Sequence, residues 1–454
     1  MNKDRNAEQY RYMTETPVHK LIITLGVPTI LSTLISTIYN LADTYFVGSI
    51  STSASGAVGI VFSLMAVIQA FGFMYGHGSG TNLSKHLGMK DVETGRRYAA
   101  TGFYLSLLSG LSITILGLLF LDPFMRLLGS TETILPYSRE YGIYILLAAP
   151  LLASSCVLNN LLRYEGKAFF AMIGLCTGGL LNIFGDFVLI NIFHLGVTGA
   201  GISTAVSQLI SFVILLVPFL RKITVTSFHP KYITLKQEVI LRIFYNGSPS
   251  LIRQGLTSIS GMFLNHIAGL YGDAAIAALS IMNRITNFLF CVTIGLGQGL
   301  QPVSAFNFGA KFYSRVKEAF WFGLKLSVVL ILLLGVISFG FAEQLITLFR
   351  DDPEVIMIGT KALRYECFIL PAICFSTFAN MLFQSIGQGK IAAFLASLRS
   401  GLCLIPSLFI LTSLFGLTGL QLTYPVSDLS AGLLSIYPVM KFLNHLPEDG
   451  MDLY

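Results

Sequence analysis

Five polar side chains in the first half of the chain fall within long apolar stretches, and their types suit a shared site. Two are carboxylic acids, Asp43 and Asp186, and the others are Asn182, Thr204 and Tyr141. Asn182 and Asp186 are four residues apart, so they share one face of a helix. An ionisable group in a membrane-spanning helix is costly and usually faces the bundle interior or a cavity. We therefore expect these five side chains to face inward.

A pair of carboxyl groups in a low-dielectric site supports two kinds of chemistry. The two groups cannot both ionise comfortably side by side, so one holds a proton, and the pair can load and release H⁺. Asp43, Asn182, Asp186 and Thr204 also offer the hard oxygen ligands that suit Na⁺. A third interpretation is a hydrogen-bond network that holds the helices together. The residue types leave H⁺ and Na⁺ equally open as the bound ion.

The elements that position these residues are membrane spans. Hydrophobic residues make up 54% of the chain and charged residues 11%, with a mean hydropathy of +0.72. Twelve stretches reach the roughly 20 mostly apolar residues that a spanning helix needs. In them Asp43 lies near the outer end of span 1, Tyr141 near the outer end of span 4, Asp186 in the outer half of span 5, and Thr204 two turns into span 6. The chain direction thus predicts one common depth for the cluster.

The two halves of the chain repeat each other at an offset of 221 residues, as from Gly26 and Pro28 to Gly247 and Pro249. Duplicated six-span units are typical of secondary transporters. We therefore expect an all-α membrane protein with twelve transmembrane helices in two six-helix lobes related by a pseudo-twofold axis along the membrane normal. The expected domains are an N-terminal lobe at 1–220, a cytoplasmic linker at 221–238 and a C-terminal lobe at 239–454.

The basic residues predict orientation and exclude some functions. Lys and Arg gather in the loops on one side, which places both termini in the cytoplasm of a multi-pass protein of the plasma or inner membrane. This bias explains the net charge of +6 and gives no reason to invoke nucleic acid. No enzyme or phosphate-binding motif stands out. Uphill transport would therefore draw on an ion gradient.

The second half carries cations within its spans. Arg253 and Arg284 are candidates to pair with Asp428, which we take as the only deep carboxylate of that half. Pro28 and Pro249 lie inside spans 1 and 7, where a proline removes a helical hydrogen bond and permits a bend. We predict a hinge at each, with a static kink as the alternative.

The order and spacing of several motifs resemble a known family over nearly all of the chain. The stretch from Asn40 through Asp43 to Gly48 resembles a first-span motif of the MATE (multidrug and toxic compound extrusion) family, and Asn182-Ile-Phe-Gly-Asp186 resembles its fifth-span motif. The segment Gly196-Val-Thr-Gly-Ala-Gly201-Ile-Ser-Thr204 is similar to its sixth-span entry. The resemblance is closest to the MepA-type branch of the family.

The resemblance implies a cation-coupled antiporter, driven by H⁺ or Na⁺, that exports amphipathic, mainly cationic drugs by rocking of two lobes. It implies no enzyme activity and no cofactor besides the coupling ion, and it assigns the cation site to Asp43, Asn182, Asp186 and Thr204, with Tyr141 beside them. The expected partners are small organic cations and the lipid bilayer, and we expect a monomer. Aromatic and sulfur-containing side chains suit such cations, and we expect the following to border the substrate cavity: Tyr39, Met65, Met262, Phe263 and Phe288.

Two other functions stay open on the sequence. A flippase for a lipid-linked precursor would need a more strongly charged cavity for a pyrophosphate head group. The positive charges of Arg253 and Arg284 are compatible with such a cavity. A non-transporting membrane receptor or enzyme would show an extra soluble domain or a catalytic arrangement, and we find neither in the sequence.

Overall fold

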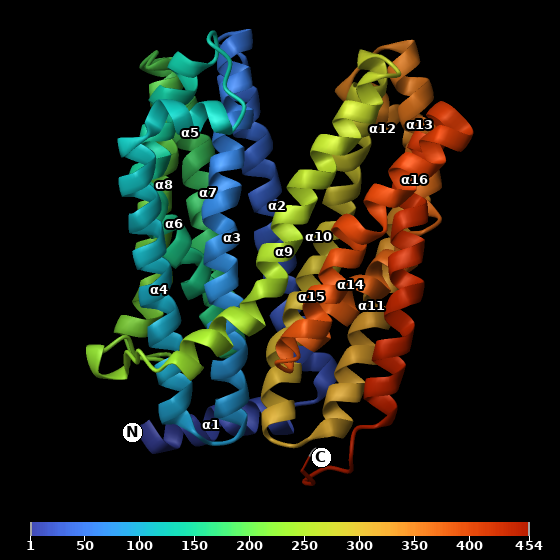
Figure 1. Ribbon diagram of the computed structural model, residues 1–454. Coiled ribbons are helices and arrows are strands. Elements are labelled where there is room, and N and C mark those ends of the chain that lie inside the picture. The colour runs from blue at the N-terminus through green and yellow to red at the C-terminus, as the bar shows by residue number, and fades with distance from the viewer. Residues whose placement is uncertain (1, 453–454) are drawn as a thin grey trace. The chain divides into compact units, whose positions relative to one another are not determined.

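The computed structural model describes residues 2–452, and its elements are helices throughout that range (Figure 1). The first half contains α1 (Asn2–Glu15), α2 (Val18–Gly48), α3 (Thr52–Gly88), α4 (Val92–Leu119), α5 (Leu121–Leu127), α6 (Leu135–Tyr164), α7 (Ala168–Asp186), the π-helix η1 (Phe187–Ile192) and α8 (Gly196–Leu220). After the 3₁₀-helix η2 (Pro230–Tyr232), the second half contains α9 (Gln237–Gly269), α10 (Asp273–Gly309), α11 (Tyr313–Gly340), α12 (Ala342–Phe349), α13 (Pro353–Cys367), α14 (Leu370–Ser385), α15 (Gly389–Ser397), the π-helix η3 (Leu398–Leu402) and α16 (Leu404–Asn444).

The predicted twelve-helix fold is confirmed. Within residues 2–452, nine helices are long and apolar enough to cross a membrane, and α13 with α14 forms a tenth span bent by 59°. One of the nine runs from Gly389 to Asn444 and holds two of the predicted spans, which meet at the non-helical Gly416 (φ 56°, ψ −131°). The remaining span is α9, whose interior carries Asn246, Arg253 and Gln254 and is therefore less apolar.

The described residues form two compact units whose boundaries differ from the expected lobes. Unit 1 contains residues 1–15 and 27–247, and unit 2 contains residues 16–26 and 248–454. Both divisions within a helix fall one residue before a proline, at Gly26–Val27 in α2 and at Gly247–Ser248 in α9. The predicted linker at 221–238 belongs to unit 1.

The segments that change unit are counterparts in the internal repeat. Residues 16–26 correspond to 237–247 at the offset of 221, and each packs in the unit built mainly by the other half. Glycine permits both contacts because small residues let helix backbones approach closely. A Cβ on Gly299 would lie 3.2 Å from the carbonyl oxygen of Ile22, and a Cβ on Gly78 would overlap the carbonyl oxygen of Ile243.

The linker is fastened to unit 1 by a buried carboxylate at the end of α6. Glu165 Oε2 accepts a hydrogen bond from the backbone N–H of Val225 (2.7 Å), and Oε1 accepts one from Thr226 (2.8 Å). Arg96 Nε donates to the Val225 carbonyl at 2.7 Å. Burial raises the pKa of Glu165, against the opposing effect of the two N–H groups that favour its ionised form. The linker is therefore an ordered part of unit 1.

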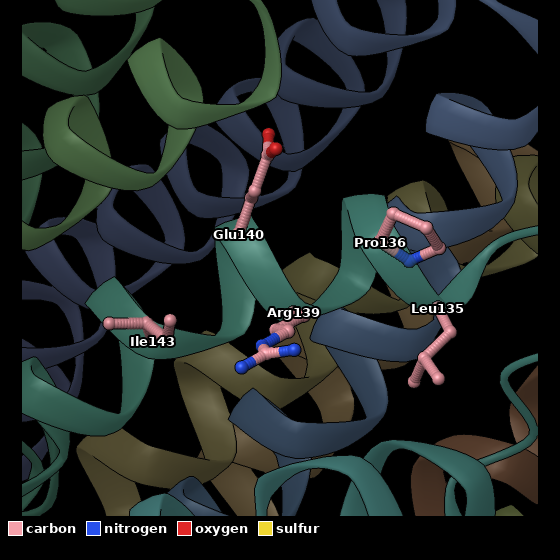
Figure 2. A pocket seen from close by; sticks show the side chains of 5 residues that line it. All are labelled: Leu135, Pro136, Arg139, Glu140 and Ile143. Carbon is pink, nitrogen blue, oxygen red and sulfur yellow. The ribbon is translucent and has the colours of Figure 1, made fainter.

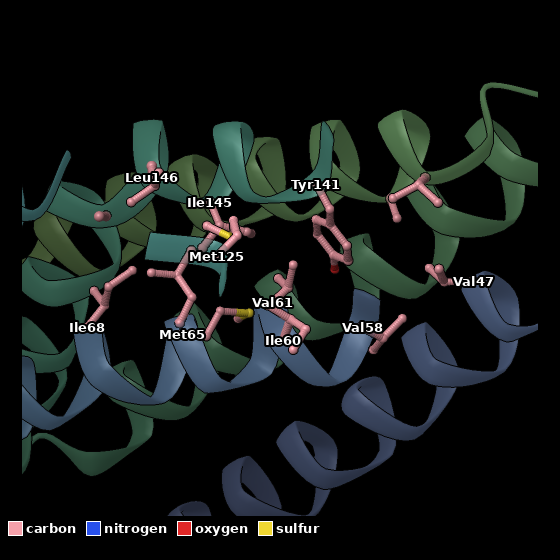
Figure 3. Packing of buried hydrophobic residues seen from close by; sticks show 14 of the residues in the cluster. Val47, Val58, Ile60, Val61, Met65, Ile68, Met125, Tyr141, Ile145 and Leu146 are labelled. Carbon is pink, nitrogen blue, oxygen red and sulfur yellow. The ribbon is translucent and has the colours of Figure 1, made fainter. Parts of the chain in front are cut away.

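An apolar core in unit 1 surrounds the ring of Tyr141 (Figure 3). Val47 comes from α2, Val58 and Val61 come from α3, and Ile145 follows Tyr141 by one turn of α6. These side chains exclude water from the ring and leave only its hydroxyl to find a polar partner.

Candidate functional site

The hydroxyl of Tyr141 lies at the centre of a buried polar cluster in unit 1. Tyr141 Oη donates to Asp43 and lies 3.0 Å from both carboxylate oxygens. It also lies 3.2 Å from Thr204 Oγ1. Each of these three side chains is at most 3% exposed. The hydroxyl thus joins helices α2, α6 and α8.

Asn182 extends the cluster to α7. Its Nδ2 donates to Thr204 Oγ1 at 3.1 Å and to Ser203 Oγ at 3.3 Å. The Ser203 hydroxyl in turn donates to the backbone carbonyl of Asn182 at 3.0 Å. Since Thr204 accepts from Asn182, its own hydroxyl proton is free to point at Tyr141, which directs the row of donors toward Asp43.

The carboxyl groups of Asp43 and Asp186 are near enough to interact electrostatically. Asp186 is completely buried, and neither of its oxygens has a hydrogen-bond donor among residues 2–452. The side-chain oxygen of Asn182 also has no donor in that part of the chain. Both carboxylate oxygens of Asp186 and the amide oxygen of Asn182 are therefore buried acceptors without a hydrogen-bond donor in that part of the chain.

One monovalent cation corrects this imbalance. A proton on Asp186 would turn the contact into a carboxyl-to-carboxylate hydrogen bond and remove one buried charge. A sodium ion would be met by oxygen atoms of Asp186 and by Oδ1 of Asn182, which are hard ligands. The donor set fits either ion.

Local helix geometry sets the position of Asp186. Asp186 is the last residue of α7, and the π-helical turn η1 follows it directly. Such turns are rare and occur frequently at functional sites. One residue earlier, a Cβ on Gly185 would lie 2.5 Å from Ser203 Oγ, so glycine allows α7 to approach α8 closely.

The structure therefore brings together all five residues of the predicted cluster. Ser203 was not predicted as part of the cluster, although it directly precedes Thr204, and no feature of the sequence indicated the π-helix η1. The close contact at Gly185 was also missed.

The residues expected to border a substrate cavity have different surroundings. Met65 is 4% exposed and packs in the core around Tyr141, which contradicts its expected place at a cavity wall. Tyr39 is partly buried and lies beside Gly179 of α7. In unit 2, Met262, Phe263 and Phe288 are exposed, and the Phe263 ring contacts Phe409 at 5.9 Å.

The prediction that Arg253 or Arg284 pairs with Asp428 is wrong. Asp428 pairs with Arg399, whose Nε lies 2.8 Å from Asp428 Oδ1. Arg253 instead donates to Asn380 Oδ1 at 3.2 Å, and Arg284 is exposed on α10. Arg399 was not predicted as the partner because it lies in the apolar run of span 11, where the π-helix η3 turns it toward α16. Glu366 is also buried, so Asp428 is not the only deep carboxylate of that half.

The two prolines predicted as hinges lie inside helices, Pro28 in α2 and Pro249 in α9. Each directly follows the position where its helix passes from one unit to the other.

A separate surface depression lies at the start of α6 (Figure 2). It is lined by Leu135, Pro136, Arg139, Glu140 and Ile143. Arg139 forms a long ion pair with Asp122 (3.7 Å), and Thr198 Oγ1 donates to Glu140 Oε2 at 3.4 Å. These exposed groups are already paired, so the depression offers no buried polar site.

Comparison with known proteins supplies the family. A family model described as MatE matches residues 28–188 and 249–410, one segment in each half. The chain is 30% identical over 449 residues to the multidrug export protein MepA of Staphylococcus haemolyticus (strain JCSC1435), with 98% of each chain covered. It is 29% identical to MepA of Staphylococcus saprophyticus subsp. saprophyticus, over 98% of this chain and 99% of that protein.

Solved structures show the same fold. An outward-facing multidrug resistance MATE family transporter of the MOP superfamily matches with a TM-score of 0.91 at 24% identity, over 97% of this chain and 98% of its own. A MATE in the bent conformation matches with a TM-score of 0.89 at 24% identity and the same coverage. With its twelve-span layout, its duplicated MatE segments and its full-length similarity to MepA, this chain belongs to the MATE family of transporters.

Proposed function

We propose that this protein is a cation-coupled antiporter that exports amphipathic, mainly cationic drugs. The observation that carries the proposal is the buried carboxyl pair of Asp43 and Asp186, which lacks one cation for balance. Asn182, Thr204 and Tyr141 complete the coupling site, and the coupling ion is H⁺ or Na⁺. The relatives named multidrug export proteins support the same class of cargo.

The ion and the drug must favour different conformations for exchange to occur. A ligand that binds two states equally shifts nothing between them. In the proposed cycle an ion from outside binds at Asp43 and Asp186, the lobes rock, and the drug leaves outward. The ion is then released inward and the drug site is loaded again. The protein acts as a monomer in the plasma membrane with both termini in the cytoplasm.

The surroundings of Arg253 and Arg284 do not support the flippase alternative. A flippase would need a more strongly charged central cavity, whereas Arg253 hydrogen-bonds Asn380 and Arg284 is a single exposed residue of α10. No other observation favours a pyrophosphate head group.

Imposing each ion gradient separately tests the proposal. Purified protein in liposomes loaded with ethidium should lose dye faster when an inward H⁺ or Na⁺ gradient is applied, because ion entry drives drug exit. One of the two gradients should suffice alone, and that gradient identifies the coupling ion. Dye loss that is equal with either gradient and with none would reject ion-coupled export.

We further propose that Pro28 is a hinge in the transport cycle. The missing hydrogen bond at a helical proline lowers the resistance to bending, and Pro28 follows the point where α2 passes between units. A related fold solved in a bent conformation supports this role.

Pro28→Ala should slow efflux several-fold, since the restored hydrogen bond stiffens α2, while drug affinity stays near the wild-type value. Pro150→Ala, at a partly buried position inside α6 within unit 1, is the matched control. Initial efflux rates and equilibrium ethidium binding measure the two quantities. Wild-type efflux in Pro28→Ala would identify a static kink instead.

A further inference from the structure

The linker between the two halves of the chain carries positive charge without an acid. Residues 221–236 contain four Lys or Arg residues and neither Asp nor Glu. The linker forms a loop that projects from the side of unit 1, beside α4 and α8 and above α1 (Figure 1). Basic residues are common in the inner loops of membrane proteins, but the contacts of this loop give its charges a specific place.

Hydrogen bonds to α4 hold the linker at the level of the membrane. Arg96 lies in the second turn of α4, and its Nε donates to a linker carbonyl at 2.7 Å. Further along the same helix, Thr101 Oγ1 accepts from the backbone N–H of Thr234 at 3.2 Å, and Tyr104 Oη donates to the Phe228 carbonyl at 2.9 Å. The eight residues from Arg96 to Tyr104 cover about 12 Å of helix. The linker therefore runs beside the inner part of a spanning helix.

The linker presents apolar side chains between its lysines. Leu235 is 84% exposed and Ile233 is 36% exposed. Lys231 and Lys236, on either side of them, are exposed as well. A segment with apolar tips among basic residues is suited to the boundary between lipid head groups and acyl chains.

Two cations converge on the side chain of Tyr232. Arg96 Nη1 donates to Tyr232 Oη at 3.3 Å, and the guanidinium carbon lies 5.6 Å from the centre of the ring. The ammonium of Lys231 lies 4.8 Å from the same ring centre. Partial burial acts to raise the pKa of Tyr232, but the hydrogen bonds and charges of Lys231 and Arg96 lower it overall. Neither cation has an acidic partner among residues 2–452.

We propose that Arg96, Lys231 and Tyr232 bind the phosphate head group of an anionic phospholipid, with Ile233 and Leu235 placed among its acyl chains. The guanidinium, the ammonium and the hydroxyl are all donors, and the phosphate oxygens accept from them. In the orientation proposed above, the lipid belongs to the cytoplasmic leaflet, whose anionic head groups attract Lys and Arg. The inference goes beyond the proposed function, because lipid binding requires neither a drug nor a coupling ion.

The equivalent segment of unit 2 has the opposite character. At the offset of 220, Lys231 and Tyr232 correspond to Met451 and Asp452. Asp452 Oδ1 lies 2.6 Å from the ammonium of Lys311. In unit 2 the protein itself thus supplies an acid to its lysine, whereas in unit 1 the equivalent place offers cations alone. We therefore expect one such lipid site in each chain.

Lipid binding to the purified full-length protein tests the site. Native mass spectrometry in detergent measures the dissociation constants of phosphatidylglycerol and phosphatidylcholine, and wild type should bind the anionic lipid more tightly. Lys231→Gln should weaken phosphatidylglycerol binding about fivefold, since a cation near an anionic surface contributes about 1 kcal/mol. Lys441→Gln is the matched control, because Lys441 is also exposed and lies 5.8 Å from the centre of a tyrosine ring, that of Tyr437. It should bind both lipids as wild type does.

Two further measurements separate a lipid from a free anion. Inorganic phosphate in excess should not displace phosphatidylglycerol, because phosphate offers no acyl chain to Leu235. Leu235→Ser should weaken phosphatidylglycerol binding several-fold and leave the thermal midpoint unchanged, since the side chain that it removes is exposed. Equal affinities of Lys231→Gln and Lys441→Gln for phosphatidylglycerol, or its complete displacement by phosphate, would overturn the proposal.

Discussion

Asp186→Asn is expected to abolish gradient-driven efflux while the protein stays folded. The Asn amide can donate to Asp43 much as a protonated Asp186 would, so the variant resembles a permanently loaded site. Such a site cannot release its ion inward and therefore cannot complete an exchange. Dye efflux from liposomes with the effective gradient should fall to the level of protein-free liposomes.

Asp43→Asn should have the same effect on efflux, and this variant should also stay folded. Its amide oxygen can still accept from Tyr141, and its N–H group can donate to an oxygen of Asp186, which has no other donor among residues 2–452. Asp122→Asn, which changes an acid that is 45% exposed and pairs with Arg139, is the control and should transport normally. Undiminished efflux by Asp186→Asn would remove Asp186 from the coupling site.

Gly185→Val is expected to disable the site through packing alone. A Cβ at this position lies 2.5 Å from Ser203 Oγ, and two further methyl groups would force α7 away from α8. Overpacking of this kind costs about 1–3 kcal/mol, and the displacement would carry Asp186 and Asn182 away from Thr204. Both the thermal midpoint in detergent and the efflux rate should fall.

Gly59→Ala provides the comparison for this variant, because nothing lies within 4 Å of the added Cβ on α3. It should leave efflux unchanged and stability equal or slightly higher, since alanine favours a helix over glycine by about 0.5–1 kcal/mol. Normal efflux by Gly185→Val would mean that the close approach of α7 and α8 does not position the site.

The sequence predicted the spans and the cluster of unit 1 because each rests on a strong, simple signal. Long apolar stretches define the spans, and a carboxylic acid inside a span must face inward. Asn182 and Asp186 share a face by spacing alone. Their agreement in depth with Asp43, Tyr141 and Thr204 followed from the direction of each helix.

The wrong predictions concern side chains whose contacts are determined by tertiary packing. Arg399 looked like one charge in an apolar run, and only the π-helical geometry of η3 brings it to Asp428. Met65 has a side chain suited to a greasy cation, yet it fills the core around Tyr141. The residue type indicated what each side chain could contact, but the neighbouring helices selected the contact.

The exchange of residues 16–26 and 237–247 between the units affects how the protein can be divided. A chain cut in the linker would yield two fragments, and each would lack an eleven-residue helical piece that the other fragment carries. Neither fragment should form a complete bundle when produced alone, whereas co-production should restore both. In an ancestor with a single six-helix chain, the same exchange would have bound two subunits to each other, so gene duplication and fusion would have joined partners that were already mutually dependent.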